Sequence, residues 1–154
     1  MELSKFLLPE AIVADAKAGS KKRVLQDAAA LAAEVYHLPE AKLLSALQAR
    51  ELLGPTGMGN GVAIPHARLP EIEHVSGVFM HLENPVDFSA VDRQPVDLVF
   101  VLFAPENAVT NHLKSLARVS RTLRDEAICQ KLRSTRDPAA IYSILTENER
   151  SVAA

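Results

Sequence analysis

Apolar residues recur at helical spacing in two consecutive stretches near the start of the chain. The first stretch follows Ser20, a residue typical of helix N-caps, and its spacing predicts a helix that ends near His37. The second begins at Pro39, since proline is favoured at the first helical position, and ends near Leu53, before a glycine and a proline. The apolar positions of the two stretches are Val24, Ala28, Leu31, Val35, Leu43, Leu44 and Leu47.

Shorter apolar runs at residues 62–64, 75–82 and 98–103 predict strands. The last two runs are apolar at nearly every position, which is typical of strands in a sheet that is covered on both faces. Because these two runs are joined without an obvious crossover helix, we expect the sheet to be mixed.

Helical spacing returns in the last third of the chain. It predicts a helix over about 108–124, a shorter one near 126–133, and a third over 138–146 that Asp137 caps. Helices before, between and after apolar strands indicate an α/β fold, a three-layer α/β/α sandwich with a central mixed β-sheet. A length of 154 residues fits one ordinary domain, so we expect residues 1–154 to form a single domain.

Composition and charge exclude several functional classes. Apolar residues make up 48% of the chain, enough for a compact core, and the net charge of −2 gives no overall attraction to nucleic acid or an anionic membrane. No apolar run reaches the ~20 residues of a membrane span and the N-terminus lacks a basic leader, so we expect a cytoplasmic protein. The lone Cys129 cannot form an internal disulfide, and we expect it to be buried in a helix.

The stretch GMGNGVAIPHAR, residues 57–68, places alternate glycines before a short strand. It does not match a dinucleotide fingerprint, because Val62 stands where a third glycine is required. A phosphate-binding loop needs Gly-Lys-Ser/Thr, which the chain lacks, and both fingerprints follow a strand rather than precede one. The glycines instead indicate tight turns and close backbone approach, with amides directed into a common space.

His66 follows this strand, which Pro65 ends because proline has no amide to donate to a ladder. We therefore expect His66 at the carboxyl end of the strand, the edge at which α/β sheets usually bind ligands. Arg68 projects to the same side if the backbone stays extended, although a solvated surface position is the alternative. On these grounds alone, His66 fits a catalytic role and a structural one about equally.

His112 is the second histidine that fits a site. It lies on the apolar face of the 108–124 helix, in the first turns, where the helix dipole favours anions. Because this helix follows strand 98–103, we expect His112 near His66, where two imidazoles would form an anion site; a hydrogen-bonded core histidine is the alternative. Leu113, Leu116, Val119, Ser120 and Leu123 are assigned to the same inward face, and Lys114, Arg118 and Arg121 to the solvated face.

The remaining histidines, His37, His74 and His81, are interpreted as structural. The chain has no HxxxH or CxxC spacing, so we expect neither a metal nor a cofactor. No Ser/His/Asp order or paired carboxylates are apparent, which makes a hydrolase the least favoured class.

Several segments together resemble one protein family. They are Arg50-Glu51, the run GPTGMGNGVAIPH at 54–66, Gly77-Val78, QPVDL at 94–98, and His112-Leu113. From about Leu7 to Asn148, the chain resembles the fructose/mannitol-type enzyme IIA family of the bacterial phosphoenolpyruvate-dependent phosphotransferase system (PTS EIIA type 2). The free-standing nitrogen-regulatory members are especially similar. Ala67 departs from the glycine that many members carry after the histidine.

The resemblance implies a phosphohistidine carrier built on a mixed sheet flanked by helices. His66 would accept a phosphoryl group at Nε2 from the small carrier HPr or its nitrogen-branch counterpart, while Arg50 and His112 support the site. For this chemistry we expect the His66 Nδ1–H to donate to a backbone carbonyl of the glycine-rich turn, which leaves Nε2 exposed.

The surroundings of the histidine are expected to serve the phosphoryl group and its donor. Backbone amides around Thr56, Gly59 and Gly61 would complete the cradle for the phosphoryl oxygens. An exposed apolar ring, formed partly by Met58 and Leu69, would dock the donor in a small and transient interface.

Three functions stay open at this point. The leading hypothesis is a regulatory phosphocarrier of the nitrogen branch, and the second is an enzyme IIA that passes phosphate to the IIB part of a sugar permease. The third is a binding module that is not phosphorylated, against which the joint presence of His66, Arg50 and His112 argues. Family members of the regulatory kind are associated with potassium-transport and sensor-kinase proteins, and the sequence does not choose the target.

Overall fold

The computed structural model describes residues 1–147 and 149. Residues 148 and 150–154, which the single-domain prediction includes, lie outside the described residues. The elements in chain order are η1 (Leu3–Lys5), η2 (Pro9–Ala11), β1 (Ile12–Ala16), α1 (Lys21–Tyr36), α2 (Glu40–Leu53), β2 (Gly57–Gly59), β3 (Val62–Ala63), β4 (His66–Leu69), β5 (Ser76–Val86), β6 (Val96–Pro105), α3 (Val109–Leu123), α4 (Glu126–Arg133) and α5 (Pro138–Leu145), where η marks a 3-10 helix.

The strands form one mixed sheet, as the sequence predicts. The strand order is β1-β5-β6-β3-β2, and β4 also pairs with β6. β5 is antiparallel to β6, whereas β3 and β4 are parallel to it and β1 is parallel to β5. β6 therefore lies in the middle of the sheet, and all but one of its residues are buried.

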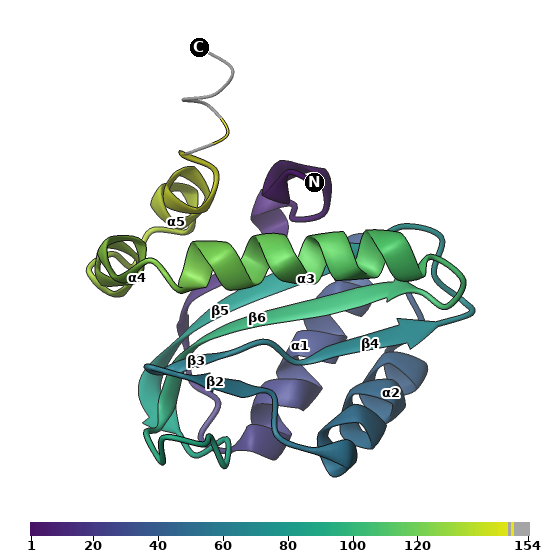
Figure 1. The fold of residues 1–154 in the computed structure, drawn as a ribbon, viewed down its shortest axis with the longest axis horizontal. Helices are drawn as coiled ribbons and strands as arrows, with labels where there is room; N and C mark the ends of the chain where they lie inside the picture. The colour runs from purple at the N-terminus through teal and green to yellow at the C-terminus, as the bar shows by residue number, and fades with distance from the viewer. Residues whose placement is uncertain (148, 150–154) are drawn as a thin grey trace.

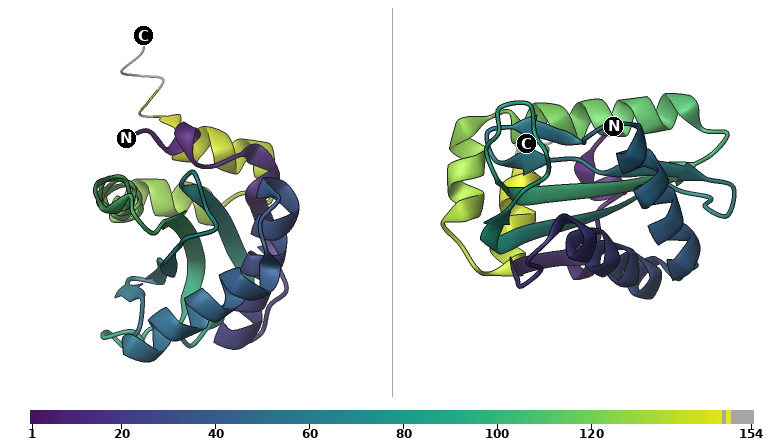
Figure 2. Two further views of the ribbon diagram at one scale, coloured as in Figure 1. Left: turned by 90° about the vertical axis from the view of Figure 1, so that its right-hand side faces the viewer. Right: turned by 90° about the horizontal axis from the view of Figure 1, so that it is seen from below.

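Helices cover both faces of the sheet, which confirms the three-layer α/β/α sandwich. α1 and α2 pack against one face, where they contact β5 and β4, and α3 lies across the other face over β6 (Figure 1). The layers are seen edge-on in Figure 2, with the sheet between α3 and the α1–α2 pair. α5 contacts β1, and α4 connects α5 to α3.

The glycine-rich stretch forms a β-hairpin, where the sequence predicts only a turn that leads into a strand. β2 and β3 are antiparallel and are joined by Asn60 and Gly61, whose φ angles are 56° and 79°. Positive φ at both positions is the geometry for which Asn-Gly is favoured in two-residue hairpin turns. The sequence does not predict β2, because this strand consists of two glycines and Met58, and glycine is disfavoured in strands.

His66 follows a strand that ends before Pro65, as predicted, but it is also the first residue of a further strand that the sequence does not predict. β3 stops at Ala63, and β4 starts at His66, which pairs with Leu102 of β6. Pro65 has no amide to donate, but its carbonyl accepts a hydrogen bond of 2.9 Å from the Leu102 amide. The chain therefore stays beside β6 through the interruption, and His66 lies directly after the break between two short strands.

Gly77 of β5 has no room for a side chain. A Cβ at this position would lie 2.8 Å from Phe100 Cε1 and 3.0 Å from the Phe6 carbonyl oxygen. We expect Gly77→Ala to lower the free energy of unfolding by about 1–3 kcal/mol, because overpacking forces the neighbours apart. Urea denaturation measures this as a lower midpoint. Gly19→Ala is the control, since a Cβ there meets nothing within 4 Å, and equal midpoints for the two variants would contradict the prediction.

Candidate functional site

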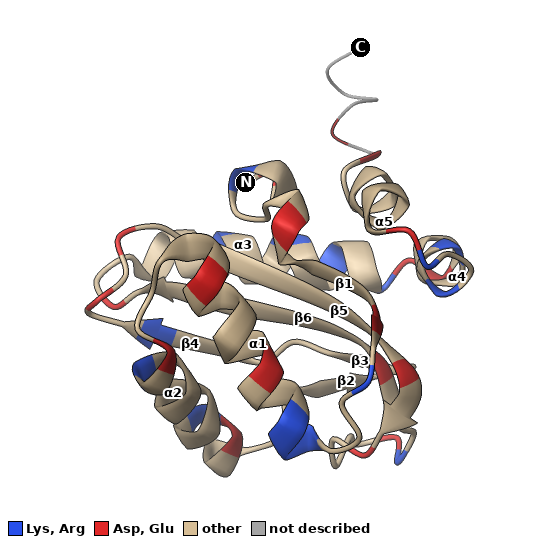
Figure 3. Ribbon diagram, turned by 180° about the vertical axis from the view of Figure 1, so that it is seen from behind, with Lys and Arg blue, Asp and Glu red and all other residues tan. Residues whose placement is uncertain are grey.

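A cleft of about 690 Å³ opens between α2, β4 and the start of α3. In the view from behind, β4 carries a basic segment and α2 carries both basic and acidic ones (Figure 3). The lining residues include the polar groups Arg50, His66, Arg68, Glu106 and His112, and the exposed apolar side chains Leu53, Val109 and Leu113.

The half-buried His66 ring is held by a backbone carbonyl. Its Nδ1 lies 2.8 Å from the carbonyl oxygen of Ile64, and a carbonyl can only accept, so Nδ1 carries the proton. The predicted Nδ1–H bond to a backbone carbonyl is confirmed, with the acceptor just beyond the hairpin. In the neutral ring this tautomer leaves a lone pair on Nε2, the atom that faces Arg50.

Arg50 lies in the last turn of α2, and its side chain contacts the unprotonated nitrogen of His66, Nε2. Its Nε is 3.4 Å from His66 Nε2, and its Nη1 donates to the Gly54 carbonyl at 2.9 Å. The second bond fixes the guanidinium against the end of its own helix, where exposed carbonyls favour a cation. Arg50 therefore brings a fixed positive charge next to Nε2 of His66.

His112 lies beside His66, as the sequence predicts. The ring centroids of the two histidines are 5.4 Å apart, although the residues come from α3 and β4. His112 is 7% exposed, and its Nε2 has no hydrogen-bond partner among the described residues. Arg68 lines the same cleft, so its predicted projection to the side of His66 is confirmed.

Both imidazoles are neutral near pH 7. Burial lowers the pKa of His66, the nearby Arg50 lowers it further, and the hydrogen bond to Ile64 opposes these effects. Burial, followed by the charges of His66 and Arg68, lowers the pKa of His112 to about 4. The surroundings therefore favour the unprotonated form of His66, which is the form with a lone pair on Nε2.

The depressed pKa of His112 predicts a pH-dependent loss of stability. In the unfolded chain His112 binds a proton near its ordinary value of 6.5, whereas in the fold it does so only near pH 4. The unfolded state therefore binds more protons between these values, and the free energy of unfolding falls as the pH drops from 6.5 to about 4, by at most ~3 kcal/mol.

His112→Leu removes this titration without adding a buried polar group. Urea unfolding at several pH values should show a shallower acid loss for the variant than for the wild-type protein. Identical slopes in the two proteins would contradict the assignment. Thr122→Val, which changes a buried polar residue of the same helix that has no titratable group, is expected to leave the acid slope intact.

The predicted cradle residues do not line the cleft. Thr56 is 6% exposed, and its hydroxyl donates to a carboxylate oxygen of Glu51. The two glycines have positive φ, and a Cβ on Gly59 would face Asp92, whereas one on Gly61 would face Arg133. These residues shape the hairpin that carries the chain to His66 rather than border the free space in front of it.

Three apolar and basic side chains differ from their predicted exposure. Leu69, expected on an exposed ring, is 4% exposed because alternate residues of β4 point into the core. Leu113, expected to face inward, is 61% exposed on the cleft rim, while Met58 is 38% exposed as expected. Arg118, assigned to the solvated face, is half-buried and lies 3.8 Å from Glu149.

Sequence analysis assigns no role to Arg133 or Asp97. Arg133 makes a two-pronged ion pair with Asp97, with nitrogen–oxygen distances of 2.8 to 3.0 Å, and donates to the Asn60 carbonyl at 3.0 Å. These bonds fasten the hairpin turn to α4. Asp97 belongs to the quoted 94–98 segment, but its partner is 36 residues away along the chain, and no local pattern reveals it.

Within the described part of the chain, no group of three or more His, Cys, Asp or Glu side chains is arranged to hold a metal ion. Across the same residues, no helix is both long enough and apolar enough to cross a membrane. Cys129 is buried in α4, as predicted, and its Sγ donates to the Leu123 carbonyl at 3.2 Å.

Comparison with known proteins gives one consistent result. Residues 5–148 match the family described as "Phosphoenolpyruvate-dependent sugar phosphotransferase system, EIIA 2". A nitrogen regulatory protein of Bradyrhizobium diazoefficiens is 50% identical over 145 residues, which cover 94% of this chain and 95% of that protein. A nitrogen regulatory protein of Escherichia coli is 40% identical over 150 residues, covering 97% and 92%. The crystal structure of nitrogen regulatory protein IIA-Ntr from Neisseria meningitidis aligns with a TM-score of 0.88 at 37% identity, covering 94% of this chain and 99% of that one.

Proposed function

The chain belongs to the EIIA type 2 family of the phosphoenolpyruvate-dependent phosphotransferase system, and on this basis we propose that it is a regulatory phosphocarrier whose acceptor is His66. The single observation that supports this acceptor best is the state of its ring. Nδ1 is held by the Ile64 carbonyl, while Nε2 has a lone pair and faces Arg50 at an open cleft. A nitrogen prepared in this way is a competent nucleophile at neutral pH.

The proposed reaction is an in-line transfer between two imidazoles. The lone pair of His66 Nε2 attacks the phosphorus of a phosphohistidine on the donor protein, and a new N–P bond forms as the donor's N–P bond breaks. The donor ring, which carries a proton on its other nitrogen, takes back the electron pair of the broken bond and leaves as a neutral imidazole. His66 keeps its proton on Nδ1 throughout, so its phosphorylated ring is an imidazolium and no separate base is required.

Arg50 and His112 are proposed to stabilise the charge on the transferred group. Arg50 Nε donates to the His66 Nε2 lone pair at 3.4 Å before the donor arrives; this bond gives way when Nε2 attacks phosphorus, and the guanidinium then donates to the phosphoryl oxygens beside it. His112 Nε2 is a buried polar atom without a partner among the described residues, and a phosphoryl oxygen would supply one. An arriving anion also raises the pKa of His112, which strengthens its bond to the oxygen.

The proposed donor is HPr or its nitrogen-branch counterpart, and the proposed role is regulation rather than sugar transport. The relatives at 40% and 50% identity over nearly the whole chain are named nitrogen regulatory protein, which favours regulation. The downstream partners would be regulated proteins such as potassium-transport or sensor-kinase proteins that distinguish the two states of His66. We also propose a cytoplasmic location, because the relay must meet donors charged by phosphoenolpyruvate.

The test is phosphorylation of the purified protein with phosphoenolpyruvate, enzyme I and an HPr-type carrier. The protein is expected to gain one phosphoryl group that is labile in acid and stable in base, located at His66 by tandem mass spectrometry. Omission of the carrier should abolish the gain. A phosphoryl group on any other residue would contradict the proposed acceptor, and rapid onward transfer to a fructose-type IIB domain would favour the transport role.

A further inference from the structure

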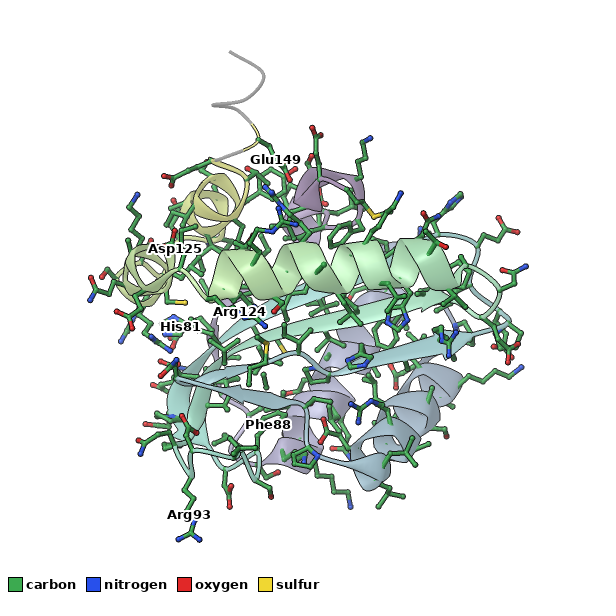
Figure 4. All side chains as sticks on the ribbon, viewed as in Figure 1. His81, Phe88, Arg93, Arg124, Asp125 and Glu149 are labelled. Carbon is green, nitrogen blue, oxygen red and sulfur yellow. The ribbon has the colours of Figure 1, made fainter. Side chains whose placement is uncertain are left out.

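Glu51, the residue after Arg50, is a buried carboxylate with two partners. Its side chain is 7% exposed, and Lys21 Nζ of α1 lies 2.6 Å from one of its oxygens. The hydroxyl of Thr56 donates to the other oxygen. The Lys21 ammonium also lies 5.5 Å from the ring centroid of the buried Phe88, which is labelled in Figure 4. The carboxylate is therefore held firmly between two helices and the start of the hairpin.

Thr56 continues this set of contacts into the backbone that carries His66. The Thr56 carbonyl accepts a hydrogen bond of 3.1 Å from the Ile64 amide. The carbonyl of the same Ile64 accepts from His66 Nδ1 at 2.8 Å. One peptide segment thus connects the buried hydroxyl of Thr56 to the protonated nitrogen of the histidine.

We propose that Glu51 and Thr56 are positioning residues that fix the tautomer of His66. By holding Ile64, they keep its carbonyl aimed at Nδ1, so that the proton stays there and the lone pair stays on Nε2. This inference rests on the proposed function of His66 as the acceptor. It gives Thr56 a task different from the cradle role expected from the sequence.

The chemistry of imidazole explains why a fixed tautomer of His66 is useful. A neutral imidazole has two tautomers, and the one with the proton on Nε2 has no lone pair there to attack phosphorus. A neighbouring acceptor that holds the proton on Nδ1 selects the reactive tautomer, as the orienting carboxylate does in serine proteases. Here a backbone carbonyl is the acceptor, and it is only as well placed as the segment that carries it.

The last turn of α2 therefore acts on both nitrogens of one ring. Arg50 contacts Nε2 directly, and Glu51, the next residue, acts on Nδ1 through Thr56 and Ile64. A purely structural role for the buried pair would stabilise the hairpin without affecting the ring. The two roles are distinguished by a measurement that reports the ring itself.

The experiment is ¹⁵N NMR of the full-length protein with labelled histidine, at a pH where His66 is neutral. In the wild-type protein the two ring nitrogens should show the widely separated shifts of a single Nδ1–H tautomer. Thr56→Val removes the hydroxyl and should move both shifts towards the average of the two tautomers. Thr56→Ser keeps the hydroxyl and should restore the wild-type shifts. Thr56→Ala tests the same loss if the valine variant does not fold.

Thr122→Val is the matched control. Thr122 is also 6% exposed, and its hydroxyl donates to the Arg118 carbonyl within α3 at 2.9 Å. This variant loses a buried hydroxyl bond, but it should leave the His66 shifts unchanged. Wild-type His66 shifts in a folded Thr56→Val or Thr56→Ala protein would overturn the proposal.

Glu51→Gln separates the charge from the hydrogen bond. It keeps an oxygen that accepts from Thr56, so the tautomer should survive. It removes the negative charge that supports a protonated His66, so the pKa of His66 measured by the same NMR signals should fall. A Glu51→Gln protein that loses the single tautomer while Thr56→Val keeps it would contradict the proposed route through Thr56.

A rate measurement connects the tautomer of His66 to phosphoryl transfer. Thr56→Val should slow phosphorylation of His66 by about 10-fold, the order expected when a residue that orients a functional histidine is lost, and Thr56→Ser should recover most of the rate. If the wild-type protein accepts no phosphoryl group, the proposed function fails while the tautomer result stands. If transfer occurs but the Thr56→Val rate and shifts equal those of the wild type, only the positioning role fails.

Discussion

The His66→Ala protein is expected to take up no phosphoryl group from a charged HPr-type carrier. The substitution removes the proposed nucleophile, Nε2 of His66, and the neighbouring groups cannot replace it. Arg50 is a cation without a lone pair for attack, and the ring of His112, although it lines the cleft, is only 7% exposed, which keeps its nitrogens from an in-line approach to the donor's phosphorus. The loss should therefore be complete within detection, and it is measured by acid-labile, base-stable incorporation of labelled phosphate.

His74→Ala is the control for this experiment. His74 is exposed and does not line the cleft of His66, so its loss should leave both the rate and the extent of labelling unchanged. Far-ultraviolet circular dichroism of both variants establishes that the fold is retained. A base-stable phosphoryl group on the His66→Ala protein would show that another histidine is the acceptor.

The helices could be predicted from the sequence because their signals are local. The Ser20 hydroxyl accepts from the Arg23 amide at 3.1 Å, as expected of an N-cap. The Asp137 carboxylate accepts from the Ala139 amide at 3.1 Å, and Pro138 is the first residue of the helix that follows. Such bonds join residues two or three positions apart, so a single sequence contains all the information that they need.

The short strands could not be predicted in the same way. β2 and β4 consist of three and four residues, and they exist because β3 and β6 are beside them to pair with. β1 is a strand because it pairs with β5, more than sixty positions later in the register Ile12–Phe79. Pairing over such distances leaves little trace in a local pattern, which is why the place of His66 at the start of β4 was missed.

In the candidate site, too, some contacts could be predicted from the sequence and others could not. The nearness of His66 and His112 could be predicted from the order of the elements, because both residues follow parallel strands of the sheet, β3 and β6. The partners of Thr56 did not follow, since Glu51 is buried by α1 as well as by its own helix. The sequence assigns Leu113 to the inward face of its helix because it is apolar, but it lies ~100° around the helix from the buried His112 and is 61% exposed.

Loss of Arg50 is expected to slow transfer to His66 severely without abolishing it. Its guanidinium is the only charged donor that contacts the acceptor nitrogen among the described residues, and the bond to the Gly54 carbonyl holds it in place before the phosphoryl group arrives. Removal of one such preorganised donor commonly lowers a rate on the order of 10²-fold. Because the cleft is open to solvent, we expect Arg50→Ala to lower the transfer rate by that factor or less. Single-turnover transfer from the phosphorylated carrier measures the rate.

The pH dependence of the Arg50→Ala rate distinguishes its two effects. The Arg50 charge helps to lower the pKa of His66, so its removal raises that pKa and leaves more of the ring protonated in mildly acidic solution. The acidic limb of the pH–rate profile should therefore move to higher pH, and the loss of rate should be greatest there. Arg93→Ala is the control, because Arg93 lies on an exposed loop at the lower edge of the view and does not line the cleft of His66 (Figure 4). An Arg50→Ala protein with the wild-type rate and profile would show that this arginine neither stabilises the phosphoryl group nor tunes its acceptor.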